Sequence, residues 1–207
     1  MLWIRSAASS SSARVLLFPE TVIPTWDDAT DAFWNETVDR LRAAGRSIIL
    51  GARIPRRGGS IPPPSEYVAA LAALSGTMST VATRGASQPK SGYFNAAIIR
   101  GAVRGTFKQR IPVPLAMWNP LESGGADIAS LGPATIRIDH HRTAILICYE
   151  QLITWPAVTS LLQDPTILLA VSNVAWVNAT PIPRFQRAAV TAWSRLFYLP
   201  VLIATND

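Results

Sequence analysis

The chain has 207 residues, which is enough for one domain with a sizeable hydrophobic core. Hydrophobic residues make up 49% of the sequence and charged residues 15%, a balance that excludes an intrinsically disordered protein. A single cysteine excludes an internal disulfide framework and a zinc site built from several cysteines. The formal charge of +6 is carried mostly by scattered arginines, so a nucleic-acid surface has weak support. A basic face toward anionic lipid is an equally open alternative.

No stretch of the sequence predicts a transmembrane helix or a secretory signal. The longest uncharged run, residues 165–183, contains Ser172, Asn173 and Asn178 and ends in prolines. It therefore lacks the roughly 20 apolar residues that a membrane helix needs. The N-terminus lacks the apolar run of about 7–15 residues that marks a signal peptide. We expect the chain as given to be soluble, and the sequence does not identify its compartment.

Serine-rich residues 1–13 predict a flexible lead, which leaves residues 14–207 as the folded domain. Short apolar runs rich in β-branched residues predict buried strands. In chain order these strands are residues 14–18, 47–50, 93–99, 102–107, 134–138, 143–148, 166–171 and 201–204. Helical periodicity predicts helices at residues 27–44, 66–74, 152–163 and 185–197, and prolines and glycines predict a loop at 53–65. The alternation indicates a layered α/β domain, and its last strand ends so near residue 207 that we expect the domain to be incomplete there.

Cys148 has the placement of a nucleophile. It ends the buried strand 143–148, and Glu150 and Gln151 open the helix that follows. Backbone N–H groups and the helix dipole at such a position favour a thiolate. On position alone, a small buried apolar residue is the commoner role of a free cysteine.

Glu20 and Lys108 share this placement, because each follows a predicted strand and lies beside proline-stiffened backbone. Each alone is typical of an exposed loop residue. Together, an acid, a cation and a thiol at one sheet edge can perform acyl transfer. The carboxylate takes the thiol proton, the thiolate attacks a carbonyl or nitrile carbon, and the ammonium stabilises the developing charge. We predict no cofactor and no metal site, since His140 and His141 point to opposite faces of a strand.

The order and local context of these residues resemble the carbon–nitrogen hydrolase (nitrilase) superfamily, whose members use a Glu-Lys-Cys triad. Within it, the Cys-Tyr-Glu form resembles the apolipoprotein N-acyltransferase branch. The Gln-Arg-Ile-Pro-Val-Pro stretch and the helix at residues 192–200 resemble the plasmid conjugal-transfer TraB proteins. The matching stretches are Phe18-Pro-Glu-Thr21, Lys108-Gln-Arg-Ile-Pro-Val-Pro114, Ile147-Cys-Tyr-Glu150, Ser172-Asn-Val-Ala-Trp176 and Ala204-Thr-Asn206.

The resemblance implies a four-layer α-β-β-α sandwich, truncated at both ends, in the nitrilase-like domain of residues 14–207. It assigns the general base to Glu20, oxyanion stabilisation to Lys108 and the nucleophile to Cys148. It places Tyr149 and Glu150 in oxyanion and substrate positioning. Asn173 and Trp176 are implied as accessory residues.

Four departures from the N-acyltransferase pattern weaken the polar surroundings of this triad. Ala116, Val174, Leu196 and Leu199 stand where that branch has charged residues. Two functions therefore stay open. One is an amidase or N-acyltransferase that forms a Cys148 thioester in plasmid conjugal transfer. The other is a catalytically inactive component of a conjugation or membrane complex.

The resemblance also carries expectations about partners and location. It implies a bacterial protein whose substrate is a small-molecule or lipid acyl or amide compound. A homodimer and membrane-associated partners are expected alternatives, with membrane association arising in a full-length form. Nucleic acid is the least supported partner.

Overall fold

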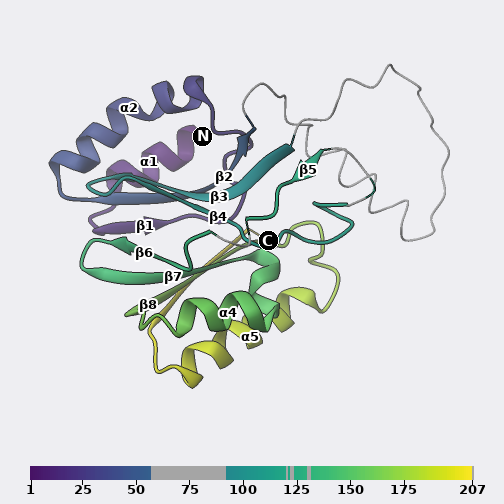
Figure 1. The fold of residues 1–207 in the computed structure, drawn as a ribbon. Coiled ribbons are helices and arrows are strands. Elements are labelled where there is room, and N and C mark those ends of the chain that lie inside the picture. Colours follow the sequence, from purple (N-terminus) through teal and green to yellow (C-terminus); the bar gives the residue numbers. More distant parts are fainter. Residues whose placement is uncertain (57–91, 120, 122–123, 130–131, 207) are drawn as a thin grey trace, which may run out of the picture.

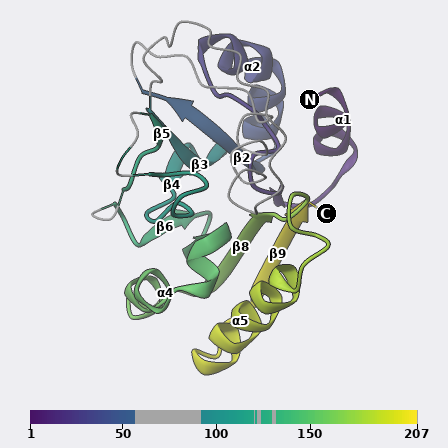
Figure 2. The ribbon, with the colours of Figure 1, turned by 90° about the vertical axis from the view of Figure 1, so that its right-hand side faces the viewer.

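The computed structural model describes residues 1–56, 92–119, 121, 124–129 and 132–206. These residues form two β-sheets packed face to face, with helices on the outer side of each (Figure 1). Figure 2 shows the same arrangement from the side, with α1 and α2 over one sheet and α4 and α5 over the other. The predicted four-layer α-β-β-α sandwich is confirmed.

The first sheet has the strand order β1-β2-β3-β4, with β5 paired to β3. Strand β1 runs parallel to β2, whereas β2–β3 and β3–β4 are antiparallel. The two helices on its outer face precede β1 and β2 in the chain. The bounds are α1 (Leu2–Ser10), β1 (Val15–Leu17), α2 (Asp28–Ala43), β2 (Ser47–Pro55), β3 (Gly92–Gly101), β4 (Gly105–Lys108) and β5 (Gly125–Ala126).

The second sheet has the order β6-β7-β8-β9. The predicted pair of strands at residues 134–138 and 143–148 is the antiparallel β6–β7 hairpin, and β7, β8 and β9 run parallel. A short 3-10 helix, η1, joins β7 to α4. The bounds are β6 (Thr135–Ile138), β7 (His141–Ile147), η1 (Cys148–Leu152), α4 (Thr154–Leu161), β8 (Ile167–Asn173), α5 (Ile182–Leu196) and β9 (Val201–Asn206).

Strand β7 is buried on both faces, as its continuous apolar run predicts. Ala144 and Leu146 face α4 and α5, whereas Ile145 and Ile147 face the core between the sheets. Because side chains alternate along a strand, one residue of offset decides which core a side chain enters. The same alternation operates in the first sheet and decides the composition of the candidate site.

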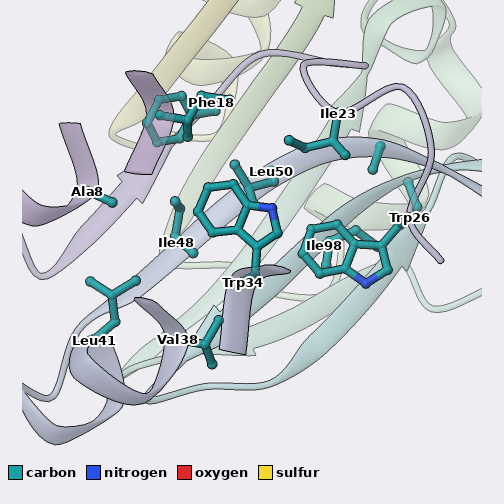
Figure 3. Close-up of a cluster of buried hydrophobic side chains, with 13 residues drawn as sticks. Ala8, Phe18, Ile23, Trp26, Trp34, Val38, Leu41, Ile48, Leu50 and Ile98 are labelled. Atoms are coloured by element: carbon teal, nitrogen blue, oxygen red, sulfur yellow. The ribbon is translucent and has the colours of Figure 1, made fainter. Parts of the chain in front are cut away.

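Helix α2 is capped at its start and followed by a glycine at its end. The Asp27 carboxylate accepts a hydrogen bond from Thr30 N at 2.8 Å, and Gly45, with φ of 65°, follows the helix. Trp34 is fully buried at the centre of the outer core and lies against Ile48 and Leu50 of β2 (Figure 3). The helix predicted at residues 27–44 is therefore confirmed.

The flexible lead predicted for residues 1–13 is wrong, because Leu2–Ser10 forms helix α1. Ile4 and Ala8, four residues apart, are buried in the core beside α2. Arg5 Nε also donates to Thr37 Oγ1 at 3.0 Å. The serine-rich composition suggested a flexible segment. The helical spacing of Ile4 and Ala8, which places both on the face that packs against the core, was therefore overlooked.

Two further predictions need adjustment. The helix predicted at residues 152–163 is divided into η1 and α4, and Pro156 lies in the first turn of α4, where a missing N–H costs no helical bond. The strand predicted at 102–107 is shifted to β4 because residues 102–104 form the turn after β3.

The helix predicted at 66–74 and most of the 53–65 loop lie outside the described residues. Among the described helices, none has the length and apolar character that crossing a bilayer requires.

We expect Trp34→Ala to lower the free energy of unfolding by about 3–5 kcal/mol, because it removes the largest fully buried side chain of the core between the first sheet and its helices. Urea unfolding followed by circular dichroism measures this change. Leu196→Ala is the matched control, since that side chain is 65% exposed on α5, and it should cost about 0.5 kcal/mol or less. Equal losses in the two variants would contradict the assigned core.

Candidate active site

Cys148 lies at a sharp turn between β7 and η1. Its φ of 50° is in the left-handed region, which non-glycine residues rarely adopt. The side chain is 5% exposed and joins the core between the two sheets. Such a conformation persists only where neighbouring contacts enforce it, and it is common at functional sites.

Buried side chains hold the Cys148 turn in place. Glu150 Oε2 accepts from Ile147 N at 3.0 Å, and Glu150 Oε1 accepts from Arg110 N at 2.6 Å. Gln151 Nε2 donates to Leu146 O at 3.3 Å and to Val171 O at 3.1 Å. These contacts join the turn to β8 and to the segment that follows β4.

Glu20 lies just past β1 and is 4% exposed. Asn95 Nδ2 donates to Glu20 Oε1 at 2.5 Å, and Asn173 N donates to Glu20 Oε2 at 2.9 Å. Its backbone passes so close to β2 that a Cβ atom at Gly51 would collide with Pro19 and Glu20. Both oxygens of the carboxyl group are thus fixed, one from each sheet.

The Glu20 carboxyl lies close enough to the Cys148 thiol for each group to influence the pKa of the other. Burial raises the pKa of the Cys148 thiol well above its ordinary value, and the negative charge of Glu20 raises it further. Burial also raises the pKa of Glu20, although the N–H donors to its carboxylate oppose this shift. The thiol therefore keeps its proton at neutral pH, with an acceptor already beside it.

Two more donors approach the sulfur. Gln186 Nε2 of α5 donates to Cys148 Sγ at 3.8 Å, and the Tyr149 N–H lies within hydrogen-bonding reach. Both contacts lower the pKa of the thiol, against the larger effect of burial. Donors placed here can stabilise negative charge on the sulfur or on a group bonded to it.

The structure does not bring Lys108 to this pair, which differs from the predicted triad. Lys108 pairs in register with Ala96, whose side chain lies in the core between the first sheet and helices α1 and α2. Its Nζ lies 3.6 Å from the centroid of the Phe94 ring. Among the described residues, no hydrogen bond or ion pair joins Lys108 to Glu20 or Cys148. Strand alternation explains the difference, because the residue that enters the site is the next one, Gln109.

Sequence reasoning missed the amide residues that surround the pair. Gln109 Nε2 donates to Ile147 O at 3.0 Å, and Gln109 Oε1 accepts from Asn95 Nδ2 at 2.8 Å. Asn95 and Gln109 are each 1% exposed. The sequence does contain one signal, because Asn95 is a polar residue inside the apolar run of β3. A buried amide needs hydrogen-bond partners, so such a residue indicates polar neighbours.

The other predicted residues have mixed outcomes. Glu150 is fully buried and pairs with Arg110. Asn173 contributes its backbone N–H to Glu20, and Trp176 Nε1 donates to Asn173 O at 2.9 Å. Trp176 therefore supports the backbone that holds the base. No cluster of three or more possible metal ligands occurs within the described part of the chain.

Comparison with known proteins finds relatives in sequence. No family model matches the chain. It is 30% identical over 205 residues to the conjugal transfer protein TraB of Agrobacterium fabrum, covering 97% of this chain and 41% of that protein. It is 36% identical over 141 residues to the probable conjugal transfer protein TraB of Sinorhizobium fredii, covering 65% of this chain and 36% of that protein. The chain thus spans less than half the length of these relatives.

Solved structures share the fold. An amidase from Nesterenkonia sp. superposes with a TM-score of 0.59 at 14% identity, over 99% of this chain and 68% of the amidase. A carbon–nitrogen hydrolase from Helicobacter pylori gives 0.60 at 12% identity, over 99% and 65%. A glutamate-to-glutamine mutant of the Nesterenkonia amidase carries acrylamide added to its active-site cysteine. The resemblance stated from the sequence, to TraB proteins and to a nitrilase-superfamily fold, is confirmed.

We expect Glu150→Gln to lower the free energy of unfolding by about 3–5 kcal/mol, because it leaves the Arg110 guanidinium buried without its charge partner. Glu36→Gln is the matched control. Glu36 also pairs with arginines but its side chain is 74% exposed, so its loss should be about 1 kcal/mol or less. Urea unfolding at neutral pH measures both, and a small loss in Glu150→Gln would contradict the structural role of this pair.

The raised pKa of Glu20 makes a prediction about stability and pH. The native state keeps this proton where the unfolded chain, with a pKa near 4.5, has released it. The stability contributed by Glu20 is therefore fully present below that value and is lost as pH rises through the raised pKa. Residue 20 does not titrate in Glu20→Gln, so the stability of this variant relative to wild type should increase as pH rises above about 4.5.

Urea unfolding of both proteins across this range measures the difference. Asp27→Asn supplies a control of opposite sign, because hydrogen bonds from Thr30 lower the pKa of Asp27. Its stability relative to wild type should fall as pH rises from acid. A pH-independent difference for Glu20→Gln would show that Glu20 is not buried as described.

Proposed function

From the sequence likeness to the conjugal transfer proteins TraB and from the carbon–nitrogen hydrolase fold, we propose that this chain performs acyl transfer through Cys148 in plasmid conjugal transfer. Glu20 accepts the thiol proton as the sulfur bonds to the acyl carbon of an amide or activated ester. The bond from that carbon to nitrogen or oxygen breaks, and the leaving group departs with a proton returned by Glu20. Water or an amine then releases the acyl group from the thioester.

The observation that carries this proposal is the burial of a carboxyl close to a thiol, each held by its own hydrogen-bond donors. Taking both groups out of water is unfavourable, and an apolar pair of similar size would pack there at lower cost. The arrangement suits a nucleophile and the base that activates it. The donors to Glu20 from Asn95 and Asn173 keep the carboxyl oriented as its charge changes.

The proposed role of Tyr149 is to stabilise the oxyanion. Its N–H follows the nucleophile at the start of η1 and already lies near the sulfur. A backbone donor at this position can approach the oxygen of an acyl group attached to Cys148. Glu150 supports this geometry by fixing Ile147 and Arg110, and it has no proposed contact with the substrate.

A second candidate function is a non-catalytic component of a conjugation or membrane complex. The observation in its favour is that the Lys108 ammonium lies over the Phe94 ring, away from Cys148. The site then lacks the cation that the Glu-Lys-Cys mechanism uses. In this alternative the fold persists and serves binding to partner proteins.

Intact-protein mass spectrometry after exposure to a panel of small-molecule and lipid-like esters and amides tests the two functions. We expect wild type to gain the mass of one acyl group. Cys148→Ala should gain none, and Glu20→Gln should gain it at least about tenfold more slowly, because loss of a general base costs about 10²–10⁴ in rate. The mass of the adduct then identifies the class of acyl donor.

Circular dichroism establishes that each variant is folded before the assay. Lys108→Gln is the matched control for a lost polar group and should keep the wild-type rate. An adduct of equal yield in Cys148→Ala would contradict the proposal. No adduct on folded wild-type protein across the panel would favour the non-catalytic function.

A further inference from the structure

A chain of neutral amides connects the base to the nucleophile turn. Asn95 Nδ2 donates both to Glu20 Oε1 and to Gln109 Oε1, at 2.5 and 2.8 Å. Gln109 Nε2 then donates to Ile147 O at 3.0 Å, directly before Cys148. This series of hydrogen bonds crosses from the first sheet to the second, and Gln109 joins Asn95 to the Cys148 turn.

The strand register determines why Gln109 holds this place. Phe107 pairs with Ala97, and both side chains lie in the core between the sheets. Lys108 pairs with Ala96 and therefore starts on the helix side. Gln109, two residues after Phe107, returns to the inner side, and its backbone N donates to Asn95 O at 2.7 Å.

We propose that Gln109, not Lys108, takes the place in this site where nitrilase-like enzymes have a lysine, and that it acts as a positioning residue. This inference rests on the proposed function only for its catalytic consequence. Its amide keeps the Glu20 carboxyl, through Asn95, in register with the turn that presents Cys148. It supplies hydrogen bonds without a charge.

The absence of an ammonium changes the electrostatics of the thiol. The charged groups packed around Cys148 are Glu20 beside it and the Arg110–Glu150 pair beyond Ile147. Arg53 of β2 is in register with Asn95, and its positive charge lowers the pKa of Glu20. Gln186 from α5 is neutral. Glu20, Gln186 and the Tyr149 N–H act on the sulfur, and none of them is a cation. The resting state is therefore a thiol beside the Glu20 carboxyl group.

This arrangement also sets the class of acyl donor. An ammonium would stabilise the oxyanion formed on a poor electrophile, and losing one such donor costs roughly 10²–10³ in rate. A site with neutral donors is suited to acyl groups that carry a good leaving group. Activated esters and thioesters are therefore the expected donors, ahead of simple amides.

A swap of two adjacent residues tests the assignment without changing composition or net charge. Lys108→Gln combined with Gln109→Lys moves the ammonium from the helix side to the inner side. An unused acceptor is available there, because Asn95 Oδ1 has no hydrogen-bond partner among the described residues. A cation near the sulfur favours the thiolate, so the pKa of Cys148 should fall.

The readout is the rate at which iodoacetamide alkylates Cys148, followed by intact mass across pH. The thiolate displaces iodide, and the thiol proton is released to solvent, so the reaction needs no acyl transfer. We expect the swap to shift the pH midpoint to lower values by about one unit, which is roughly a tenfold faster reaction near neutral pH. Lys108→Gln alone should leave the profile at its wild-type position.

Lys108→Gln keeps the assignment testable even if the swap fails to fold, since it alters a side chain that contacts Phe94 outside the site. A shift of its profile to higher pH would overturn the proposal. A folded swap with a wild-type profile would overturn it as well. If alkylation behaves as expected and no acyl group is captured, the Gln109 assignment stands and the proposed acyl transfer fails.

Discussion

The structure depends on the joint burial of one carboxyl and one thiol between two sheets. Burying these groups away from water is unfavourable unless their positions and hydrogen-bond partners are fixed. The residues around them provide this. Gly51 lets the Glu20 loop lie against β2, Asn95 and Asn173 hold the carboxyl oxygens, and η1 begins with Cys148 in a left-handed conformation. The sandwich brings these residues together because Glu20 follows a strand of one sheet and Cys148 follows a strand of the other.

Neutral amides replace charge in most of the contacts around this pair. Asn95, Gln109, Gln151 and Gln186 are all buried, and each hydrogen bonds to a residue of the site or to the backbone beside it. The buried ion pair of Arg110 and Glu150 lies beside the turn and holds its backbone. The charged Arg110–Glu150 pair therefore has a structural role. The neutral amides around Glu20 and Cys148 can stabilise negative charge that develops during a reaction, but they do not convert the resting thiol to a thiolate.

The sequence predicted the features that depend on apolar runs and on caps. The strands around Cys148, the capped helix α2 and the sites of Glu20 and Cys148 at strand ends all follow from local patterns. Helix α1 was missed because its serines mask the Ile4–Ala8 pair, which is informative only against α2. Lys108 was placed in the site because a lysine after a strand fits a known motif. Which side chains of β4 point toward the site depends on its register with β3, which the sequence does not show. Gln109 carries no charge and no motif of its own, so only packing identifies it.

The burial of Glu20 beside Cys148 can be measured directly. Because the chain has a single cysteine, selective ¹³C labelling of its Cβ gives one resonance whose shift with pH reports the thiol pKa. We expect Cys148 to titrate well above the ordinary pKa of a thiol, and we expect Glu20→Gln to lower this pKa because the neighbouring negative charge is removed. An ordinary thiol pKa that is the same in wild type and Glu20→Gln would show that the two groups are not buried beside each other.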